Sequence, residues 1–435
     1  MKNRKLKNWR AIMKSKKLIN GKTTIKIVMA CVAIGWICWS VGNTCHAQTP
    51  SGPSSDLQDR QKLVSANTGF AFDLMGQVTQ AQPDANVFIS PFSVSSALQI
   101  VGNGAAGQTE TEMQQVLHTT GLPSAIANPA FKELNQQLAL RKDVTLNLAN
   151  GIWFKQGFHL KPAFVADNKK FFQAELAGVD FDDPKSAKTI NKWADKQTQG
   201  KIKDIVQYPF DSLTRVILAN AIYFKGKWVG PFDKNQTEPR DFHLSSGKVK
   251  PTSMMEQNGG FRYQETPDFQ AVQLPYEGGL QMQVFLPAKN SSPQKLLESF
   301  KAQGNWQGNI QRAFTIQKGT LMLPKFKMEY AVRLNDSLIA LGMKRAFGGD
   351  ADFSAMADEQ LFISEVKQKS YVDVDEKGTE AAAVTTVGML VLSAQPPNRF
   401  EMIVDHPFLF VISDTASGSI LFIGIVNDPT IGRGH

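Results

Sequence analysis

The pattern of apolar and polar residues predicts many short strands along most of the chain. Strand-like apolar runs lie at residues 146–154, 215–224, 271–274, 280–286, 319–326, 370–374, 400–404, 408–412 and 420–426. One more short strand is predicted at the start of residues 86–93, where Pro91 stops it.

Segments with a helical pattern alternate with these strands. The first predicted helix begins near Leu57 and continues through Met75, and Ser90 or Ser93 can cap the apolar helix that follows Pro91. Further helical segments lie at residues 109–117, 163–172, 187–198, 293–302 and 331–341. Since no internal repeat or linker interrupts the pattern after Leu57, we predict one large α+β domain of mostly antiparallel sheets.

The run from Glu376 to Ser393 has strand character but an unusual beginning. Alternate residues are small and uncharged, then larger and apolar: Thr379, Ala381, Ala383, Thr385, Val387 and Met389. Glu380, the only charged residue after Thr379 in this run, has the opposite parity. Because strand side chains alternate between faces, the run can enter a sheet with one face buried and Glu380 in water. An ordinary strand or an Ala-rich helical turn is the alternative that these residues leave open.

The positive charge of the chain is concentrated at its start. The formal net charge is +9, but residues 1–26 hold ten Lys and Arg and residues 1–47 hold no Asp or Glu. Subtracting these ten charges leaves −1 for the remainder. We therefore expect no nucleic-acid partner.

This basic start is typical of a secretory signal peptide. An apolar core, Ile27 to Val41, follows it, and Cys45-His46-Ala47 suits cleavage. We expect residues 1–47 to be a signal peptide, residues 48–56 a disordered linker and residues 57–435 a single domain that is secreted to the extracellular space, or to the periplasm of a bacterium. Translation from Met13 and a retained leader are the alternatives, although the apolar core is shorter than the roughly 20 residues that span a bilayer.

Residues for catalysis or metal binding are not found in a recognisable arrangement. All three cysteines, Cys31, Cys38 and Cys45, lie in the leader, so the mature domain is expected to need no disulfide. The histidines form no His-Glu-x-x-His motif, and Gly-x-Ser-x-Gly and Gly-rich dinucleotide motifs do not occur. We therefore expect no enzyme, with no catalytic residues, metal or cofactor.

Six blocks in consistent order resemble the serpin family over residues 57–429. They are Asn86-Val-Phe-Ile-Ser-Pro-Phe-Ser93, Thr189-Ile-Asn-Lys-Trp-Ala-Asp-Lys-Gln-Thr-Gln-Gly-Lys-Ile202, Leu218-Ala-Asn-Ala-Ile-Tyr-Phe-Lys-Gly-Lys-Trp228, Asp375-Glu-Lys-Gly-Thr-Glu-Ala-Ala-Ala383, Asp405-His-Pro-Phe408 and Phe422-Ile-Gly-Ile425. The resemblance implies the serpin fold, with three β-sheets, eight to nine α-helices and an exposed reactive-centre loop.

In that fold, the run from Glu376 to Ser393 is bait for a protease. Counting the family's usual spacing of about seventeen residues from Glu376 places the scissile bond at Leu392-Ser393, although Met389, Leu390 and Val391 are also plausible cleavage residues. The resemblance further implies that cleavage lets Thr379 to Leu392 insert into the central sheet as a new strand. The protease would remain as a covalent acyl-enzyme, dragged about 45 Å at roughly 3.3 Å per residue and distorted.

Three groups of residues carry over from the family. The hinge is Glu376, Lys377, Gly378, Thr379, Glu380, Ala381, Ala382 and Ala383, in which Gly378 permits a bend and the small residues allow entry. The shutter, a polar cluster beneath the opening sheet, is Ser90, Ser93, Asn220 and Gln368. The breach, where insertion begins, is Trp228, Lys325 and Glu376.

The shutter departs from the family once, because Gln368 stands where a histidine is usual. Glutamine both donates and accepts hydrogen bonds, so the network is expected to survive without a titrating group. In the breach, Lys325 and Glu376 are expected to form an ion pair. The alternatives are ordinary capping for the shutter serines and a surface ion pair worth about 0–1 kcal/mol for the breach.

The resemblance implies a suicide-type inhibitor of serine or cysteine endopeptidases. Leu392 and the apolar residues before it suit a chymotrypsin-, elastase- or subtilisin-like target. The expected partner is that protease, in a covalent complex with a monomer that is prone to loop-sheet polymers, with no membrane association after signal removal. A non-inhibitory serpin, a carrier or chaperone that is cleaved as a substrate, is the alternative, against which the small hinge residues argue.

Overall fold

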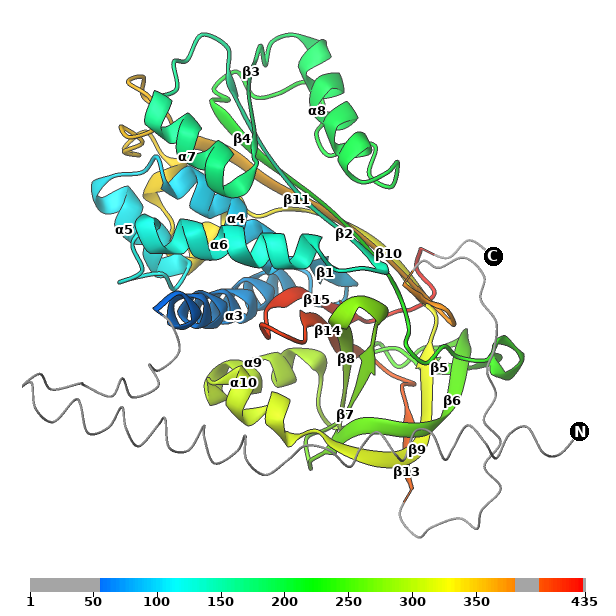
Figure 1. Cartoon of the computed structure of the whole chain (residues 1–435). Coiled ribbons are helices and arrows are strands. Elements are labelled where there is room, and N and C mark those ends of the chain that lie inside the picture. The colour runs from blue at the N-terminus through cyan, green and yellow to red at the C-terminus, as the bar shows by residue number, and fades with distance from the viewer. Residues whose placement is uncertain (1–54, 380–398, 433–435) are drawn as a thin grey trace, which may run out of the picture. The chain divides into compact units, whose positions relative to one another are not determined.

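Two hydrogen-bonded sheets organise residues 55–379 and 399–432, the part of the chain that this computed structural model describes (Figure 1). The strand order in the six-stranded sheet is β10-β11-β12-β4-β2-β3. In that order the strands span Phe326–Arg333, Ile363–Asp375, Gly378–Thr379, Val216–Lys227, Val144–Lys155 and Glu175–Val179. The inserted position of the two-residue β12, between β11 and β4, is the feature of this sheet that bears on function.

The nine-stranded network has the order β1-β15-β14-β8-β7-β6-β9-β13, and β5 pairs with β6. These strands span Val87–Ile89, Ile420–Val426, Phe408–Asp414, Leu280–Pro287, Phe269–Pro275, Val249–Glu265, Thr315–Pro324, Phe400–Ile403 and, for β5, Glu238–His243. The long β6 belongs to two parts of this network, since residues 249–254 pair with β5 and residues 262–265 pair with β7. The three implied sheets therefore correspond to the six-stranded sheet and to two parts of this network that β6 joins.

Nine α-helices lie within the described residues and confirm the α+β class. They are α3 Ser55–Ala81, α4 Pro91–Gly102, α5 Gly107–Val116, α6 Ser124–Ala139, α7 Pro162–Phe172, α8 Pro184–Gln197, α9 Pro293–Gln303, α10 Trp306–Asn309 and α11 Asn335–Leu341. Most strand pairings in this part of the chain are antiparallel, and the parallel ones are β2 with β3, β4 with β11, and β9 with β13.

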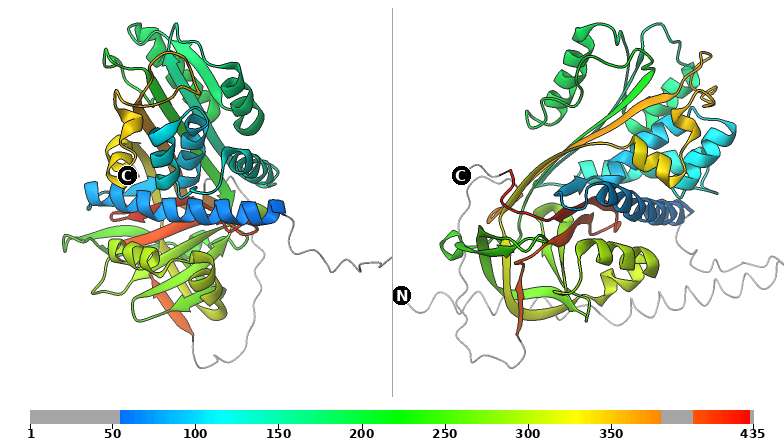
Figure 2. Two further views of the ribbon diagram at one scale, coloured as in Figure 1. Left: turned by 90° about the vertical axis from the view of Figure 1, so that its left-hand side faces the viewer. Right: turned by 180° about the vertical axis from the view of Figure 1, so that it is seen from behind.

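Helices cover both faces of the six-stranded sheet. Figures 1 and 2 show α8 on one face and α4 to α7 on the other. Along β4, Ile217 and Ala219 pack in the apolar cluster beneath α8, whereas Leu218 and Ile222 belong to the main core. Burial on both faces explains why this strand is almost continuously apolar.

The structure corrects several predicted boundaries. The predicted helix at residues 331–341 is wrong in its first residues, because residues 326–333 form β10 and the helix begins at Asn335. The predicted strand at residues 319–326 is divided, since β9 ends at Pro324, which lacks a backbone N–H donor. The helix α3 starts at Ser55, so the last two residues of the predicted linker are helical.

Six elements, α6, α10, β3, β5, β6 and β10, are not predicted by the pattern. In β6 the reason is composition, because its middle, Glu256 to Gly260, is polar and Gly-rich and is held in place by pairing with β9.

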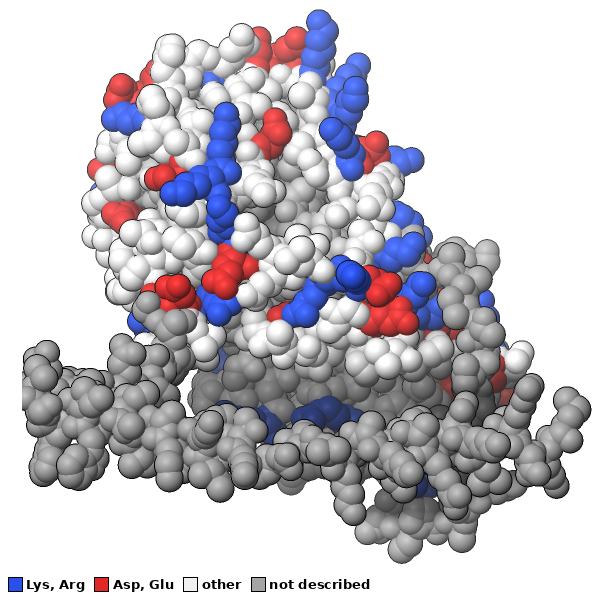
Figure 3. Space-filling model, in the orientation of Figure 1, with Lys and Arg blue, Asp and Glu red and all other residues white. Residues whose placement is uncertain are grey.

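Charges of both signs are mixed on the surface in Figure 3, except where Lys and Arg gather over α8. The exposed lysines of that helix are Lys185, Lys188, Lys192 and Lys196. Among the described residues, no helix has the length and apolar character needed to cross a bilayer.

Candidate functional site

The parallel strands β4 and β11 are neighbours over only part of their length. They pair from Val216 with Ile363 to Tyr223 with Tyr371, and then they separate. In the gap β12 pairs antiparallel with both, so that Thr379 lies opposite Val374 of β11 and Gly226 of β4. The six-stranded sheet thus already contains the first residues of an additional strand.

Thr379 is the buried end of this short strand. Its side chain is 0% exposed, and its hydroxyl lies 2.8 Å from the hydroxyl of Tyr276. The inward direction of Thr379 agrees with the predicted parity, in which small residues face the core. Tyr276 is fully buried, and this burial raises the pKa of its hydroxyl, which therefore stays protonated and shares a hydrogen bond with the hydroxyl of Thr379.

Gly378 makes the tight entry of β12 possible. Its φ of +141° lies in the region that side chains rarely adopt, and a Cβ atom there would collide with the carbonyl oxygen of Gly226. Only glycine meets both conditions without strain. This conformation is consistent with the expected bend at Gly378.

The breach residues Lys325 and Glu376 form a partly buried ion pair. Lys325 Nζ donates to both carboxylate oxygens of Glu376 at 2.9 Å, and Thr237 Oγ1 donates to Glu376 Oε1 at 2.9 Å. Glu376 is only 3% exposed and the side chain of Lys325 is 21% exposed, so the pair is less exposed than the surface alternative assumes. Burial alone raises the pKa of Glu376, but the hydrogen bonds from Lys325 and Thr237 and the charge of Lys325 outweigh it and lower that pKa.

Trp228, the third breach residue, holds the start of the hinge to the sheet. Its indole N–H donates to the carbonyl of Asp375 at 3.0 Å, and its backbone N–H donates to the carbonyl of Lys377 at 3.0 Å. The ring stacks on Tyr276 with centroids 4.2 Å apart. The structure therefore brings all three breach residues together around residues 375–379.

The four shutter residues also meet, where β4 and β11 are still paired. Gln368 Nε2 donates to Asn220 Oδ1 at 2.6 Å and to the carbonyl of Ser90 at 3.0 Å, and Gln368 Oε1 accepts from the Ser90 N–H at 2.9 Å. Asn220 Nδ2 donates to Ser93 Oγ and to Asn150 Oδ1. All four are at most 1% exposed, so opening the sheet requires breaking a buried network.

Ser90 has two roles in this network. It is the N-cap of α4, accepting from the Ser93 N–H at 3.4 Å, and its hydroxyl donates to the carbonyl of Leu421 in β15 at 2.7 Å. The capping alternative is therefore true of Ser90, but it does not account for the contacts with Gln368.

Because the shutter amide of Gln368 does not titrate, we expect the rate of sheet opening to change little between pH 5 and pH 8. The measurement is the tryptophan fluorescence change after loop cleavage, followed across this pH range. In a Gln368→His variant, the rate should acquire a transition near the ordinary histidine pKa of about 6.5. A steep change near that pH in the unmodified protein would contradict this account.

Several residues of the candidate site fall beyond the described chain. The scissile bond Leu392-Ser393 and the hinge residues Glu380, Ala381, Ala382 and Ala383 lie outside the described residues. The placement of Glu376, Lys377, Gly378 and Thr379 is described.

Three contributors to the site are missing from the sequence prediction. They are Tyr276 and Thr237, which contact Thr379 and Glu376, and Asn150, which contacts Asn220. Of these three residues, Asn150 was the one that the sequence could have indicated, because it is a polar residue within an apolar predicted strand. Nothing local marks Tyr276 or Thr237, since their contacts with Thr379 and Glu376 join segments at least 103 residues apart.

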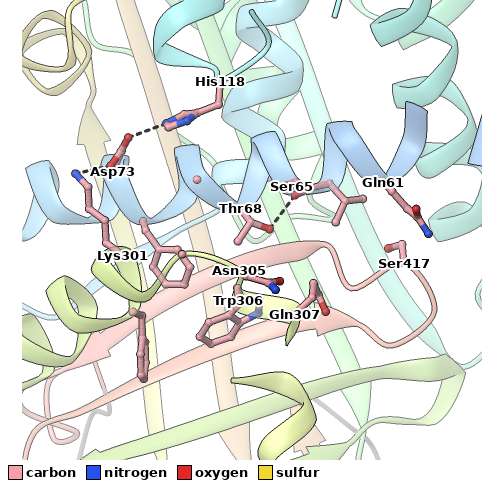
Figure 4. Close-up of a pocket in the computed structure, with 15 residues that line it drawn as sticks. Gln61, Ser65, Thr68, Asp73, His118, Lys301, Asn305, Trp306, Gln307 and Ser417 are labelled. Carbon is pink, nitrogen blue, oxygen red and sulfur yellow. Dashed lines mark hydrogen bonds and ion pairs between the residues drawn. The ribbon is translucent and has the colours of Figure 1, made fainter. Parts of the chain in front are cut away.

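A separate cavity of about 620 Å³ lies between α3, α9 and α10 (Figure 4). Asp73, on its wall, bonds His118 Nε2 at 2.7 Å and pairs with Lys301. Trp306 also lines it, and the buried indole N–H of Trp306 has no hydrogen-bond partner among the described residues. The cavity shares no lining residue with the breach or the shutter.

Comparison with known sequences places the chain beside members of one family. The family model described as "Serpin (serine protease inhibitor)" matches residues 65–429. The leukocyte elastase inhibitor of Bos taurus is 37% identical over 381 residues, which are 85% of this chain and 100% of that protein. An uncharacterized serpin-like protein of Thermococcus kodakarensis is 37% identical over 402 residues, 89% of this chain and 91% of that protein.

Solved structures agree with this placement. Serpin48 of the insect Tenebrio molitor matches with a TM-score of 0.75 at 34% identity, covering 87% of this chain and 100% of that one. The thermophilic serpin tengpin in its native state matches with a TM-score of 0.77 at 28% identity, covering 84% and 94%. Human thyroxine-binding globulin, in complex with its ligand, matches with a TM-score of 0.76 at 27% identity, covering 85% and 99%.

Proposed function

Because the chain belongs to the serpin family, we propose that it is an inhibitor that traps serine, and also cysteine, endopeptidases after cleavage at Leu392-Ser393. The observation that carries this proposal is β12, a two-residue strand already seated between β4 and β11 with Thr379 facing the core. Cleavage would free residues 379–392 to continue this strand, while the protease remains bound through its acyl group.

The registers of β12 determine where an inserted strand would lie. Continued along both neighbours, they bring Thr385 opposite Gln368 of β11 and Asn220 of β4. The inserted strand would separate the side-chain amides of Gln368 and Asn220, so each would need a new hydrogen-bond partner. The hydroxyl of Thr385 would lie between them and could supply one. The parity that buries Thr379 also directs Thr385 toward the same face.

Insertion is favourable because of the pairing it replaces. The strands β4 and β11 are parallel, and β12 is antiparallel to both. A full insertion therefore exchanges one parallel ladder for two antiparallel ones, which are slightly more stable per residue. Insertion would form on the order of ten new backbone hydrogen bonds at about 1 kcal/mol each, and this gain in free energy is comparable to the stability of a whole domain. The uncleaved form would therefore be kinetically trapped.

The target that we propose is a protease with an apolar specificity pocket. Residues 389–392 are Met-Leu-Val-Leu, and no Lys or Arg lies between Thr379 and Pro397. Relatives from several mammals carry the name leukocyte elastase inhibitor, which supports an elastase- or chymotrypsin-like target. The protein would act as a secreted monomer after loss of residues 1–47, on the strength of the leader composition.

A carrier function is the second candidate, and the cavity in Figure 4 favours it. Its volume of about 620 Å³ is in the ordinary range for small-molecule sites, and the unpartnered Trp306 N–H could donate to a ligand. A structural relative, thyroxine-binding globulin, is a ligand carrier by name. The small hinge residues and the seating of β12 between β4 and β11 still favour inhibition.

The deciding experiment mixes the mature protein with pancreatic elastase and with chymotrypsin and separates the products on a denaturing gel. We expect a covalent band at the summed mass of inhibitor and protease, and a released fragment that begins at Ser393. Catalytically inactivated protease should give no such band. Complete cleavage without a covalent band would reject inhibition and favour the carrier.

A further inference from the structure

One face of the helix α8 carries four exposed lysines in a line. They are Lys185, Lys188, Lys192 and Lys196, and Figure 3 shows Lys and Arg gathered over this helix. At about 100° per residue the four side chains lie within about 80° of arc, and the line is about 16 Å long at roughly 1.5 Å per residue. We call these four residues the α8 lysine stripe.

The stripe is an excess of positive charge that the helix does not offset. The one acid on α8 is Asp195, which is half-buried, so the helix carries a net charge of +3. Since residues 27–435 together carry −1, that range without α8 carries −4. None of the four lysines has an ion-pair partner within residues 55–379 and 399–432. The positive charge of the domain is therefore concentrated on this helix and is available to a partner.

These lysines do not stabilise the helix that carries them. Lys185 lies in the first turn, where the helix dipole disfavours a cation. Lys188, Lys192 and Lys196 follow one another at intervals of four residues, so successive ammonium groups repel each other. Asp183, just before the helix, is its N-cap and accepts from the backbone N–H of Lys185. A line of like charges that lowers helix stability indicates binding to an anion rather than a structural role.

The chemistry of the stripe distinguishes between classes of polyanion. The apolar face of α8 is closed, because Ile190 and Ala194 are fully buried in the cluster beneath the helix, so it cannot enter a lipid surface. The stripe holds no arginine, and Trp193, the one aromatic residue of α8, packs edge-on against Trp153 and is not free to stack on a base. A chain of sulfate or carboxylate groups needs only point charges at regular intervals, which lysines supply.

We propose that the α8 lysine stripe binds an acidic polysaccharide, a linear chain of sulfate or carboxylate groups that lies along the helix. Successive lysines are separated by a rise of about 4.5–6 Å, so an extended chain can present an acidic group to each of them. The stripe shares no residue with the breach or the shutter, and Figure 1 shows α8 and β13 at opposite ends of the molecule. The inference is therefore independent of the proposed inhibitory function.

The test measures binding to fluorescently labelled dextran sulfate by anisotropy over a range of salt concentrations. It uses the mature protein of the gel experiment, because the ten Lys and Arg of residues 1–26 would themselves bind a polyanion. By the counterion-release relation for nucleic acids, four contacts predict a slope of about −3 for log K against log salt. Replacing two lysines, Lys188→Gln with Lys192→Gln, should lower the affinity about 25-fold, at about fivefold per lysine, and should halve the slope.

Two further variants are matched to this pair. Lys188→Arg with Lys192→Arg keeps both charges and should preserve the affinity and the slope. Lys295→Gln with Lys318→Gln removes the same total charge from exposed positions on α9 and β9, and it should change the affinity by less than about twofold. Thermal unfolding midpoints establish that every variant is folded.

The outcomes decide between a specific surface, general charge and another class of polyanion. The inference is overturned if the mature protein does not bind dextran sulfate, or if the two Gln pairs lose affinity equally. Single-stranded DNA and vesicles of anionic lipid are the competing probes. If either binds more tightly than dextran sulfate at the same salt and depends on Lys188 and Lys192, the assignment to a polysaccharide is wrong.

Discussion

A Thr379→Arg variant should be cleaved by elastase as a substrate and should trap almost none of it. Thr379 is fully buried beside Tyr276, and the inserted strand must keep this position filled as it enters. An arginine there brings a charge into the core beside Tyr276, with no carboxylate among the described contacts of this position, which costs several kcal/mol. A barrier higher by about 3–5 kcal/mol slows insertion on the order of 100-fold or more.

The measurement is the stoichiometry of inhibition, the moles of inhibitor needed to inhibit one mole of protease, together with the covalent band on a gel. Thr379→Ser is the matched control, because it keeps the hydroxyl that meets Tyr276 and adds no bulk. Circular dichroism and the unfolding midpoint of the uncut variant establish that it is folded. Undiminished inhibition by a folded Thr379→Arg protein would show that insertion is not the mechanism.

A Lys325→Glu variant should self-associate on warming, whereas the unmodified protein remains monomeric. The substitution removes the cation that holds Glu376 and places a second carboxylate beside it. Leaving a buried charge without its partner typically costs about 3–5 kcal/mol. Because Glu376 begins the hinge, the loss loosens the gap at β12, where the loop of its own or another molecule can enter.

Size-exclusion chromatography after prolonged warming below the unfolding midpoint checks this expectation. The charge-swapped double variant, Lys325→Glu with Glu376→Lys, should restore the monomer because it rebuilds the pair in reverse. If the Lys325→Glu protein stays monomeric after the same treatment, the ion pair does not help to keep the sheet closed.

The ion pair of Lys325 and Glu376 also determines the lowest pH at which it stabilises the fold. The pKa of Glu376 is lower in the folded protein than in the unfolded chain, so the pair stabilises the fold fully above the unfolded value of about 4.3. This contribution is lost as the pH falls through the lower, folded pKa. The self-association of Lys325→Glu is therefore expected throughout the neutral range, where the unmodified protein is protected.

Local sequence pattern accounts for the elements that are strongly apolar or well capped. The strands β4, β8, β14 and β15 are recognisable because nearly every residue is buried, and α4 is recognisable from Ser90 and Pro91. The polar strand β6 is not, because it forms only through long-range pairing with β9, and residues 331–333 join β10 because β11 pairs with them. Strand propensity depends on such neighbours more than helix propensity does.

By itself, the sequence determined the α+β class, the family resemblance and the parity that buries Thr379, since alternation is a local property of a strand. It also supplied the shutter and breach residues, through the family resemblance. Only the tertiary structure decided that Lys325 and Glu376 are a partly buried pair and that Tyr276 and Asn150 complete the site. These are contacts between distant segments, and the pairing of β4, β11 and β12 brings them together.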